Sequence, residues 1–284
     1  MILLEVYSQI SKSKKIKGEE NRKGELQINK TKKRKMKGQR VTVTDVESQN
    51  VVLAEVVYVH EQSVNIRRGF VRKVFGILTV QLAVTFLICL GFGLNTSVQT
   101  YVTTNAWPFW LSFVSAMACY IAFACSPPEK VNRHPFNIFA LSLITIFFGI
   151  FLGCVSAQYT LQSVYIAAAI TCGVSLGLML FACQTTIDLT GKGLYLFGFF
   201  WTLFLIGICL PMQSFESEGF SIVLSSLWVL CFAMYIVYDT QLILGGEKRH
   251  RQFSIDSYVY AALNLYIDII NMFLLVLGMG GNRR

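Results

Sequence analysis

Two aspartates interrupt apolar stretches near the carboxyl end of the chain. Asp239 follows Tyr238 at the end of one apolar run, and Asp268 lies midway through the next. An ionised carboxylate inside a bilayer is costly unless a partner, water or a proton compensates it, so such residues usually serve a function. Taken alone, Asp239 fits a helix-end carboxylate at the cytosolic membrane surface. The position of Asp268 favours a functional role.

Polar residues around Asp268 recur at helical spacing. Asn264, Asp268 and Asn271 are spaced i, i+4, i+7, which places them on one face of a helix. If the two apolar runs form neighbouring helices, Asp239 and Asp268 can share a proton or a cation. Two close carboxylates cannot both ionise without cost, so the pair is expected to respond to cytosolic pH.

The elements that must position these side chains are membrane spans. With 54% hydrophobic and 14% charged residues, the composition is far from that of a soluble protein. Apolar runs recur at about the 20 residues needed to cross about 30 Å of hydrocarbon. They predict an all-α polytopic membrane protein with seven transmembrane helices, at about residues 74–94, 107–125, 136–154, 161–183, 194–212, 220–239 and 258–278.

A basic segment precedes the predicted spans. The first 73 residues hold 17 of the 25 Lys and Arg but only 8 of the 16 Asp and Glu. We expect residues 1–64 to be a disordered cytosolic tail and residues 65–284 to be the transmembrane domain. Such a tail could bind nucleic acid, but beside a span its charge more simply marks the cytosolic side and contacts anionic lipid head groups. The predicted partner is therefore the lipid bilayer, with no nucleic acid.

The charges of the loops predict the orientation. With the amino terminus in the cytosol, the inside loops carry the lysines and arginines and the outside loops carry none. The inside set is Lys130, Arg133, Lys192, Lys248, Arg249 and Arg251. An odd number of spans then places the carboxyl terminus outside.

Several other kinds of site are disfavoured. None of the eight cysteines forms a C-x-x-C motif, so we expect neither a disulfide framework nor a zinc site. The three histidines, His60, His134 and His250, lie outside the spans and outside any H-E-x-x-H motif, which excludes a metal hydrolase. No catalytic residue and no cofactor is predicted.

Two G-x-x-x-G patterns lie within the spans. Gly149 with Gly153 and Gly173 with Gly177 would let helix backbones approach closely. Packing within the bundle is the simpler interpretation of both, and a dimer interface is the alternative.

Four motifs, in order, resemble the transmembrane Bax inhibitor motif family, lifeguard branch. They are residues 65–74 (NIRRGFVRKV), 181–190 (FACQTTIDLT), 238–246 (YDTQLILGG) and 258–271 (YVYAALNLYIDIIN). The resemblance covers roughly residues 58–281. It implies a seven-helix Bax-inhibitor-like bundle with a central helix enclosed by the others.

The resemblance also implies a function. It implies a pH-sensitive Ca²⁺ leak or Ca²⁺ regulator associated with suppression of apoptosis, in the endoplasmic reticulum or Golgi, with the plasma membrane and lysosome as alternatives. Asp239 and Asp268 would be the ion pathway and pH sensor and would hold Ca²⁺ transiently, as transported ion rather than cofactor. Asn264, Asn271 and Tyr238 would form the supporting polar face. Apoptosis regulators or other Ca²⁺ channels are the implied protein partners.

Two alternatives remain open at this stage. An intramembrane aspartyl protease also needs two acids on its sixth and seventh helices, the first in a Tyr-Asp pair. Its second acid should lie in G-x-G-D, however, and Leu265-Tyr266-Ile267 precedes Asp268 here. The other alternative is a membrane adaptor that conducts no ions and regulates other channels or death receptors.

Overall fold

The structure, a computed structural model, describes residues 64–127, 131, 133–209, 218–245, 253 and 255–283. The predicted basic tail, residues 1–64, lies outside the described residues except for Val64. The α-helices are α3 (Val64–Leu94), α4 (Thr96–Thr104), α5 (Trp107–Ala124), α7 (Phe136–Ser156), α8 (Leu161–Gln184), α9 (Gly193–Cys209), α10 (Glu218–Leu244) and α11 (Tyr258–Gly280). Two short 3-10 turns, η2 (Thr190–Lys192) and η4 (Ile255–Ser257), precede α9 and α11.

The prediction of seven spans is confirmed. Within the described residues, seven helices are long and apolar enough to cross a membrane, and only α4 is too short. The helix of the first span, α3, begins at Val64, ahead of the predicted start of the span at residue 74, so Arg67, Arg68 and Arg72 lie on its first turns. The helix includes these arginines because long polar side chains do not interrupt a helical backbone and can reach past the end of the apolar layer.

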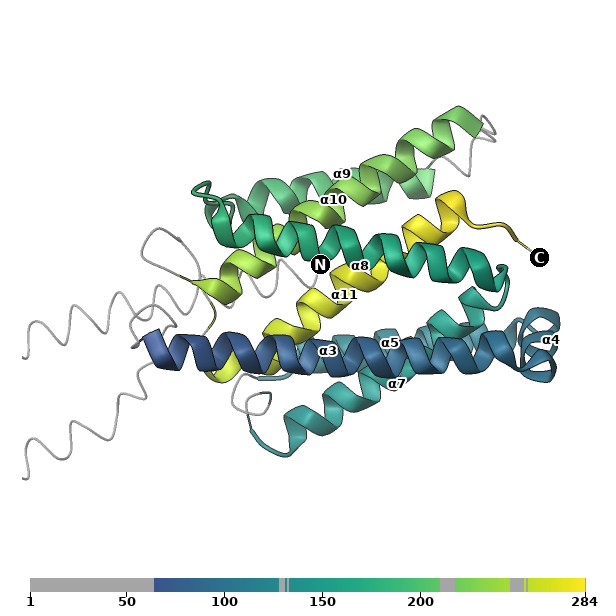
Figure 1. The fold of residues 1–284 in the computed structure, drawn as a ribbon, viewed down its shortest axis with the longest axis horizontal. Coiled ribbons are helices and arrows are strands. Elements are labelled where there is room, and N and C mark those ends of the chain that lie inside the picture. The colour runs from purple at the N-terminus through teal and green to yellow at the C-terminus, as the bar shows by residue number, and fades with distance from the viewer. Residues whose placement is uncertain are drawn as a thin grey trace, which may run out of the picture. The chain divides into compact units, whose positions relative to one another are not determined.

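The last span, α11, is the central helix, as expected. It contacts α3, α7, α8 and α10, and Figure 1 shows it crossing between α3, α5 and α7 on one side and α8, α9 and α10 on the other. Eleven of its residues are buried, and Leu263, Leu265 and Tyr266 are fully covered. A helix covered on all sides holds its polar groups away from both lipid and water.

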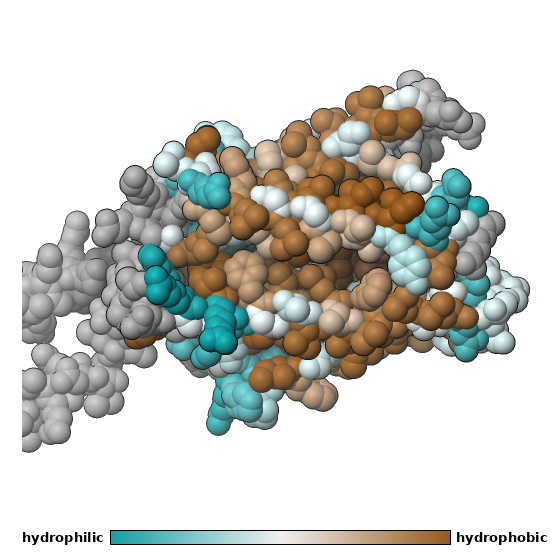
Figure 2. Space-filling model, in the orientation of Figure 1, coloured by the Kyte–Doolittle hydropathy of each residue, from teal (hydrophilic) through white to brown (hydrophobic). Residues whose placement is uncertain are grey.

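The outer surface is apolar across the middle of the molecule. Large exposed hydrophobic side chains such as Leu87, Trp110, Phe139 and Leu180 come from several helices. Figure 2 shows this apolar belt, with hydrophilic side chains gathered at its two ends. In a soluble protein so large an exposed apolar surface would be unfavourable, but lipid chains cover it in a bilayer.

The two glycine patterns differ in their surroundings. A Cβ atom on Gly153 would lie 2.9 Å from the ring of Phe92, and one on Gly149 would lie 2.6 Å from Ile88. Packing of the first pattern within the bundle, between α7 and α3, is therefore confirmed. For Gly173 and Gly177 the same expectation is wrong, because no described atom lies within 4 Å of either Cβ position. Their face of α8 is turned away from the helices that α8 packs against.

The carboxyl-terminal residues pack on the turn between α7 and α8. Asn282 accepts a hydrogen bond from the Thr160 amide through its carbonyl oxygen (2.9 Å), and its own amide donates to Ser163 Oγ (3.0 Å). The guanidinium of Arg283 lies 5.7 Å from the centre of the Tyr159 ring. The end of α11 is thereby attached to the start of α8.

Candidate functional site

The two acids predicted from the sequence meet inside the bundle. Asp239 of α10 is 6% exposed and Asp268 of α11 is 8% exposed. Their side chains are hydrogen-bonded to each other. A hydrogen bond between two carboxyl groups requires a proton on at least one of them, so this geometry excludes a pair in which both acids are ionised.

The location of Asp239 differs from that of a helix-end residue. The prediction ended the sixth span at residue 239, whereas α10 continues to Leu244 and ends at Gly245, whose φ is 59°. At a rise of about 1.5 Å per residue, Asp239 lies about 7 Å inside the end of its helix. A helix commonly ends at a residue in the αL conformation, which glycine adopts most easily. Gly245 is the first glycine after Asp239, so the helix continues for one more turn before it ends.

The groups around the pair are neutral and polar. Tyr120 of α5, Tyr235 of α10 and Tyr260 of α11 lie close enough to interact electrostatically with one or both acids. Cys231 of α10 likewise lies near Asp268. Within the described part of the chain, no lysine, arginine or histidine pairs with either acid. No cationic side chain of the described residues therefore compensates a negative charge on the pair.

The other residues of the predicted polar face take different positions. Asn264 is hydrogen-bonded to Tyr260, which lies beside Asp239. Asn271 donates to the carbonyl of Ile267 in its own helix, at 2.8 Å. Tyr238 points to α9, where its hydroxyl lies 2.7 Å from the position that a Cβ on Gly193 would take. Asn264 thus extends the polar environment of the acids, whereas Tyr238 contacts the neighbouring helix.

One oxygen of the acid pair is unsatisfied. Oδ2 of Asp268 is buried and has no hydrogen-bond partner among the described residues. A buried acceptor without a partner is costly, so such an atom marks a place for a proton, a water molecule or a cation. No group of three or more His, Cys, Asp or Glu side chains gathers at one place in the described residues, at the acid pair included.

Gln241 was not singled out from the sequence, although it lies two residues after Asp239. It is fully buried on α10, and its side chain binds the loop between α8 and η2. Its Oε1 accepts from the Leu189 amide and its Nε2 donates to the Ile187 carbonyl, both at 2.9 Å. The signal available in the sequence was that Gln241 carries a polar amide side chain in an otherwise apolar run. The helix that carries Asp239 is thereby attached to this loop.

Sequence reasoning also missed the three tyrosines near the acids. Tyr120 comes from a span more than a hundred residues earlier, so only the tertiary structure brings it to the pair. Tyr235 and Tyr260 share helices with the acids, and their spacing from Asp239 and Asp268 was the available signal: Tyr235 precedes Asp239 by one helical turn.

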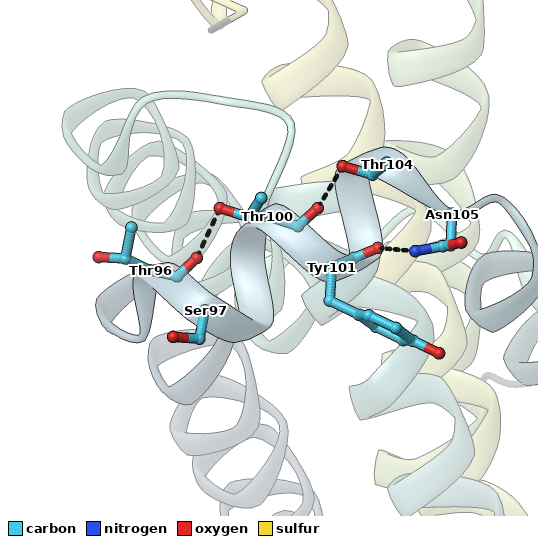
Figure 3. A pocket seen from close by; sticks show the side chains of 6 residues that line it. All are labelled: Thr96, Ser97, Thr100, Tyr101, Thr104 and Asn105. Carbon is cyan, nitrogen blue, oxygen red and sulfur yellow. Dashed lines mark hydrogen bonds between the residues drawn. The ribbon is translucent and has the colours of Figure 1, made fainter.

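A surface hollow at α4 does not have the features of a binding site. It has a volume of about 510 Å³ and is lined by Thr96, Ser97, Thr100, Tyr101, Thr104 and Asn105 (Figure 3). Thr100 Oγ1 donates to the Thr96 carbonyl at 2.9 Å, and Thr104 Oγ1 donates to the Thr100 carbonyl at 2.7 Å. These donors are used within the helix, so they do not converge on a ligand.

The comparisons with known proteins cover the whole described bundle. Residues 67–284 match the family model described as inhibitor of apoptosis-promoting Bax1. The chain is 32% identical over 222 residues to Protein lifeguard 3 of Homo sapiens. The aligned region covers 77% of this chain and 70% of that protein. It is 33% identical over 212 residues to Protein lifeguard 4 of Mus musculus, and that aligned region covers 75% of this chain and 84% of that protein. The matched region includes both acids.

Proposed function

Since the chain belongs to the family of inhibitors of apoptosis-promoting Bax1, we propose that it limits cell death by controlling Ca²⁺ as a proton-sensitive leak across an intracellular membrane. The proposed membrane is that of the endoplasmic reticulum or Golgi, the ion is Ca²⁺, and the proposed partners are apoptosis regulators or other Ca²⁺ channels. The observation that carries the proposal is the buried, hydrogen-bonded pair of Asp239 and Asp268.

The chemistry of the pair suits a weak and transient cation site. Ca²⁺ prefers six to eight oxygen ligands, of which carboxylates are the strongest. Two acids with nearby tyrosines offer fewer and weaker ligands than a storage site has. An ion that binds weakly can also leave, as conduction requires.

The shared proton would determine whether α10 and α11 stay together. Asp239 and Asp268 are hydrogen-bonded to each other, and a proton shared between them would join the two helices. Without the proton, two negative charges would face each other in a medium of low dielectric constant and repel. Separation of the helices would then expose carboxylate oxygens to an entering cation.

Proteolysis is a weaker explanation of the same two acids. An aspartyl protease must admit a substrate backbone beside its acids, and glycines before the second acid provide that space. Leu265 and Tyr266 are instead fully buried next to Asp268. A substrate would have to displace core side chains of the central helix.

The direct test is Ca²⁺ efflux from liposomes that contain the purified full-length protein. We expect efflux from the wild type and a change in its rate for Asp239→Asn and Asp268→Asn. Asp256→Asn is the matched control, because Asp256 is exposed and lies before α11. No efflux above that of empty liposomes would rule out the leak and leave the adaptor as the function to test. Cleavage of a model transmembrane substrate that needs both acids would establish the protease instead.

A further inference from the structure

A pocket lies at the end of the bundle where α3 begins and where α8 and α10 end. These three helix ends lie on the same side of the molecule in Figure 1. The pocket has a volume of about 450 Å³ and is lined by Arg67, Arg68, Val71, Arg72, Ala182, Cys183, Leu244 and Gly245. It lies apart from the Asp239 and Asp268 pair, and neither acid lines it. The proposed leak therefore gives it no role.

Three unpartnered guanidinium groups define the charge of this pocket. Arg67, Arg68 and Arg72 all come from the first turns of α3, where Arg68 and Arg72 share one face and Arg67 lies beside it. Within the described residues, none of the three makes an ion pair or a hydrogen bond, and no carboxylate lines the pocket. Each guanidinium has five N–H donors in a planar fork that matches phosphate oxygens.

The other residues that line the pocket are apolar or small. Val71, Ala182 and Leu244 contribute hydrocarbon from α3, α8 and α10. The first span covers Ile66–Leu94, so the arginines lie at its end, where the phosphates of a bilayer are found. Figure 2 shows hydrophilic side chains at this end, beside the apolar belt. A ligand with both phosphate and hydrocarbon matches such a pocket better than a free anion does.

We propose that this pocket binds the phosphorylated head group of an anionic membrane lipid, of the polyphosphorylated inositol type. Three positive charges match a head group with several phosphates better than one with a single charge. The volume lies in the range of small-molecule sites. Because the walls come from three helices, a bound head group would join the start of α3 to the ends of α8 and α10.

Cys183 provides a direct reporter of occupancy. It lines the pocket and is exposed, whereas Cys125 is exposed at the end of α5 and does not line the pocket. The full-length protein would be placed in nanodiscs of phosphatidylcholine alone, with phosphatidylserine at matched charge, or with phosphatidylinositol 4,5-bisphosphate. Modification of both cysteines by a water-soluble maleimide would be followed in the same sample by peptide mass spectrometry.

We expect phosphatidylinositol 4,5-bisphosphate to slow modification of Cys183 and to leave Cys125 unchanged. In Arg68→Gln/Arg72→Gln, the lipid concentration needed for protection should rise about 30-fold, from the contribution of a basic residue near an anionic surface. Arg133→Gln is the matched control, since Arg133 is exposed on a loop and is not part of the pocket. The single variant Arg72→Gln should show a smaller rise in the lipid concentration needed for protection. It replaces the double variant in this test if the double variant does not fold.

Four results would overturn the proposal. Equal protection of Cys183 by phosphatidylserine at matched charge would show that any anionic bilayer surface is sufficient. An equal loss of lipid protection in Arg133→Gln and in the pocket variants would show the same. Protection that persists in the pocket variants would exclude the arginines as ligands. Equal protection by soluble inositol trisphosphate in phosphatidylcholine nanodiscs would replace the lipid by a free phosphate ligand. None of these results depends on whether the protein conducts Ca²⁺.

Discussion

At the scale of single residues, the environment of the acid pair determines what a proton can do there. Asp239 and Asp268 lie near three tyrosines and Cys231, with no cationic side chain paired to them in the described residues. A fixed cation would hold both carboxylates ionised. Without one, only a shared proton or a bound cation can relieve the repulsion between the two carboxylates.

The first prediction concerns the pH dependence of Ca²⁺ efflux. As the pH rises, the pair loses its shared proton, repulsion between the carboxylates favours separation of α10 and α11, and efflux should increase. Asp268→Asn and Asp239→Asn should each flatten this dependence, because an amide replaces the proton-sharing acid at nearly the same size. The measurement is liposome efflux between about pH 5 and pH 8, compared for the wild type and both variants.

The double variant tests whether the acids act as one unit. Groups that share one proton are non-additive, so the double variant should differ little from either single variant. If both single variants kept the wild-type pH profile, the proton-sharing mechanism would be excluded even for a protein that conducts.

A second prediction at this scale concerns Gln241. Replacement by Leu keeps about the same volume but removes the hydrogen bonds of Gln241 to the Leu189 amide and the Ile187 carbonyl. The loss of two buried hydrogen bonds should lower stability by about 2–4 kcal/mol, which thermal unfolding in detergent would detect. Gln184→Leu, at an exposed position near the same loop, should change little. Equal melting temperatures for the two variants would show that the loop does not depend on Gln241.

At the scale of helices, close approach of α3 and α7 depends on small residues. The ring of Phe92 occupies the space beside Gly153, and Ile88 occupies that beside Gly149. The atoms of Phe92 that would meet this Cβ are Cγ and Cδ2 of its rigid ring. They cannot move aside as easily as the end of an aliphatic side chain. Gly177 of α8 has open space at the equivalent position.

The third prediction compares Gly153→Ala with Gly177→Ala. The first variant should destabilise the protein by about 1–3 kcal/mol, because the added methyl group overlaps Phe92 in a packed interface. The second should be neutral or stabilising by up to about 1 kcal/mol, since alanine favours a helix and meets no atom. Thermal unfolding of both variants in the same detergent gives the comparison. Destabilisation by Gly177→Ala as large as that by Gly153→Ala would indicate a second copy or a lipid packed on α8.

At the scale of the whole molecule, seven spans require the two termini to lie on opposite sides of the membrane. The charge distribution predicts that the amino terminus is cytosolic. The end of α11 is attached to the start of α8 by Asn282, so the carboxyl end belongs to the opposite face of the bundle from the start of α3.

The fourth prediction follows from this topology. In intact microsomes, added protease should digest a tag fused before Met1 and leave a tag after Arg284 protected. Detergent should make both tags accessible, which controls for tags that resist digestion. Equal digestion of both tags without detergent would contradict an odd number of spans.

The number of spans and the choice of the two acids followed from the sequence alone. Hydrophobic length determines whether a helix can cross a bilayer, and an aspartate within such a length is unusual enough to identify from composition. The motifs around Asp239 and Asp268 also identified the family. These features are local, since each depends on about 20 neighbouring residues.

Contacts between distant segments were decided only by the tertiary structure. The position of Tyr120 beside the acids, the attachment of the 187–189 loop to Gln241, and the pocket formed by α3, α8 and α10 each join residues far apart in the chain. The two G-x-x-x-G patterns look alike in sequence, yet Gly153 is packed and Gly177 is open. In lipid, every face of a span is apolar, so hydrophobicity does not distinguish the face that meets another helix from the face that meets lipid.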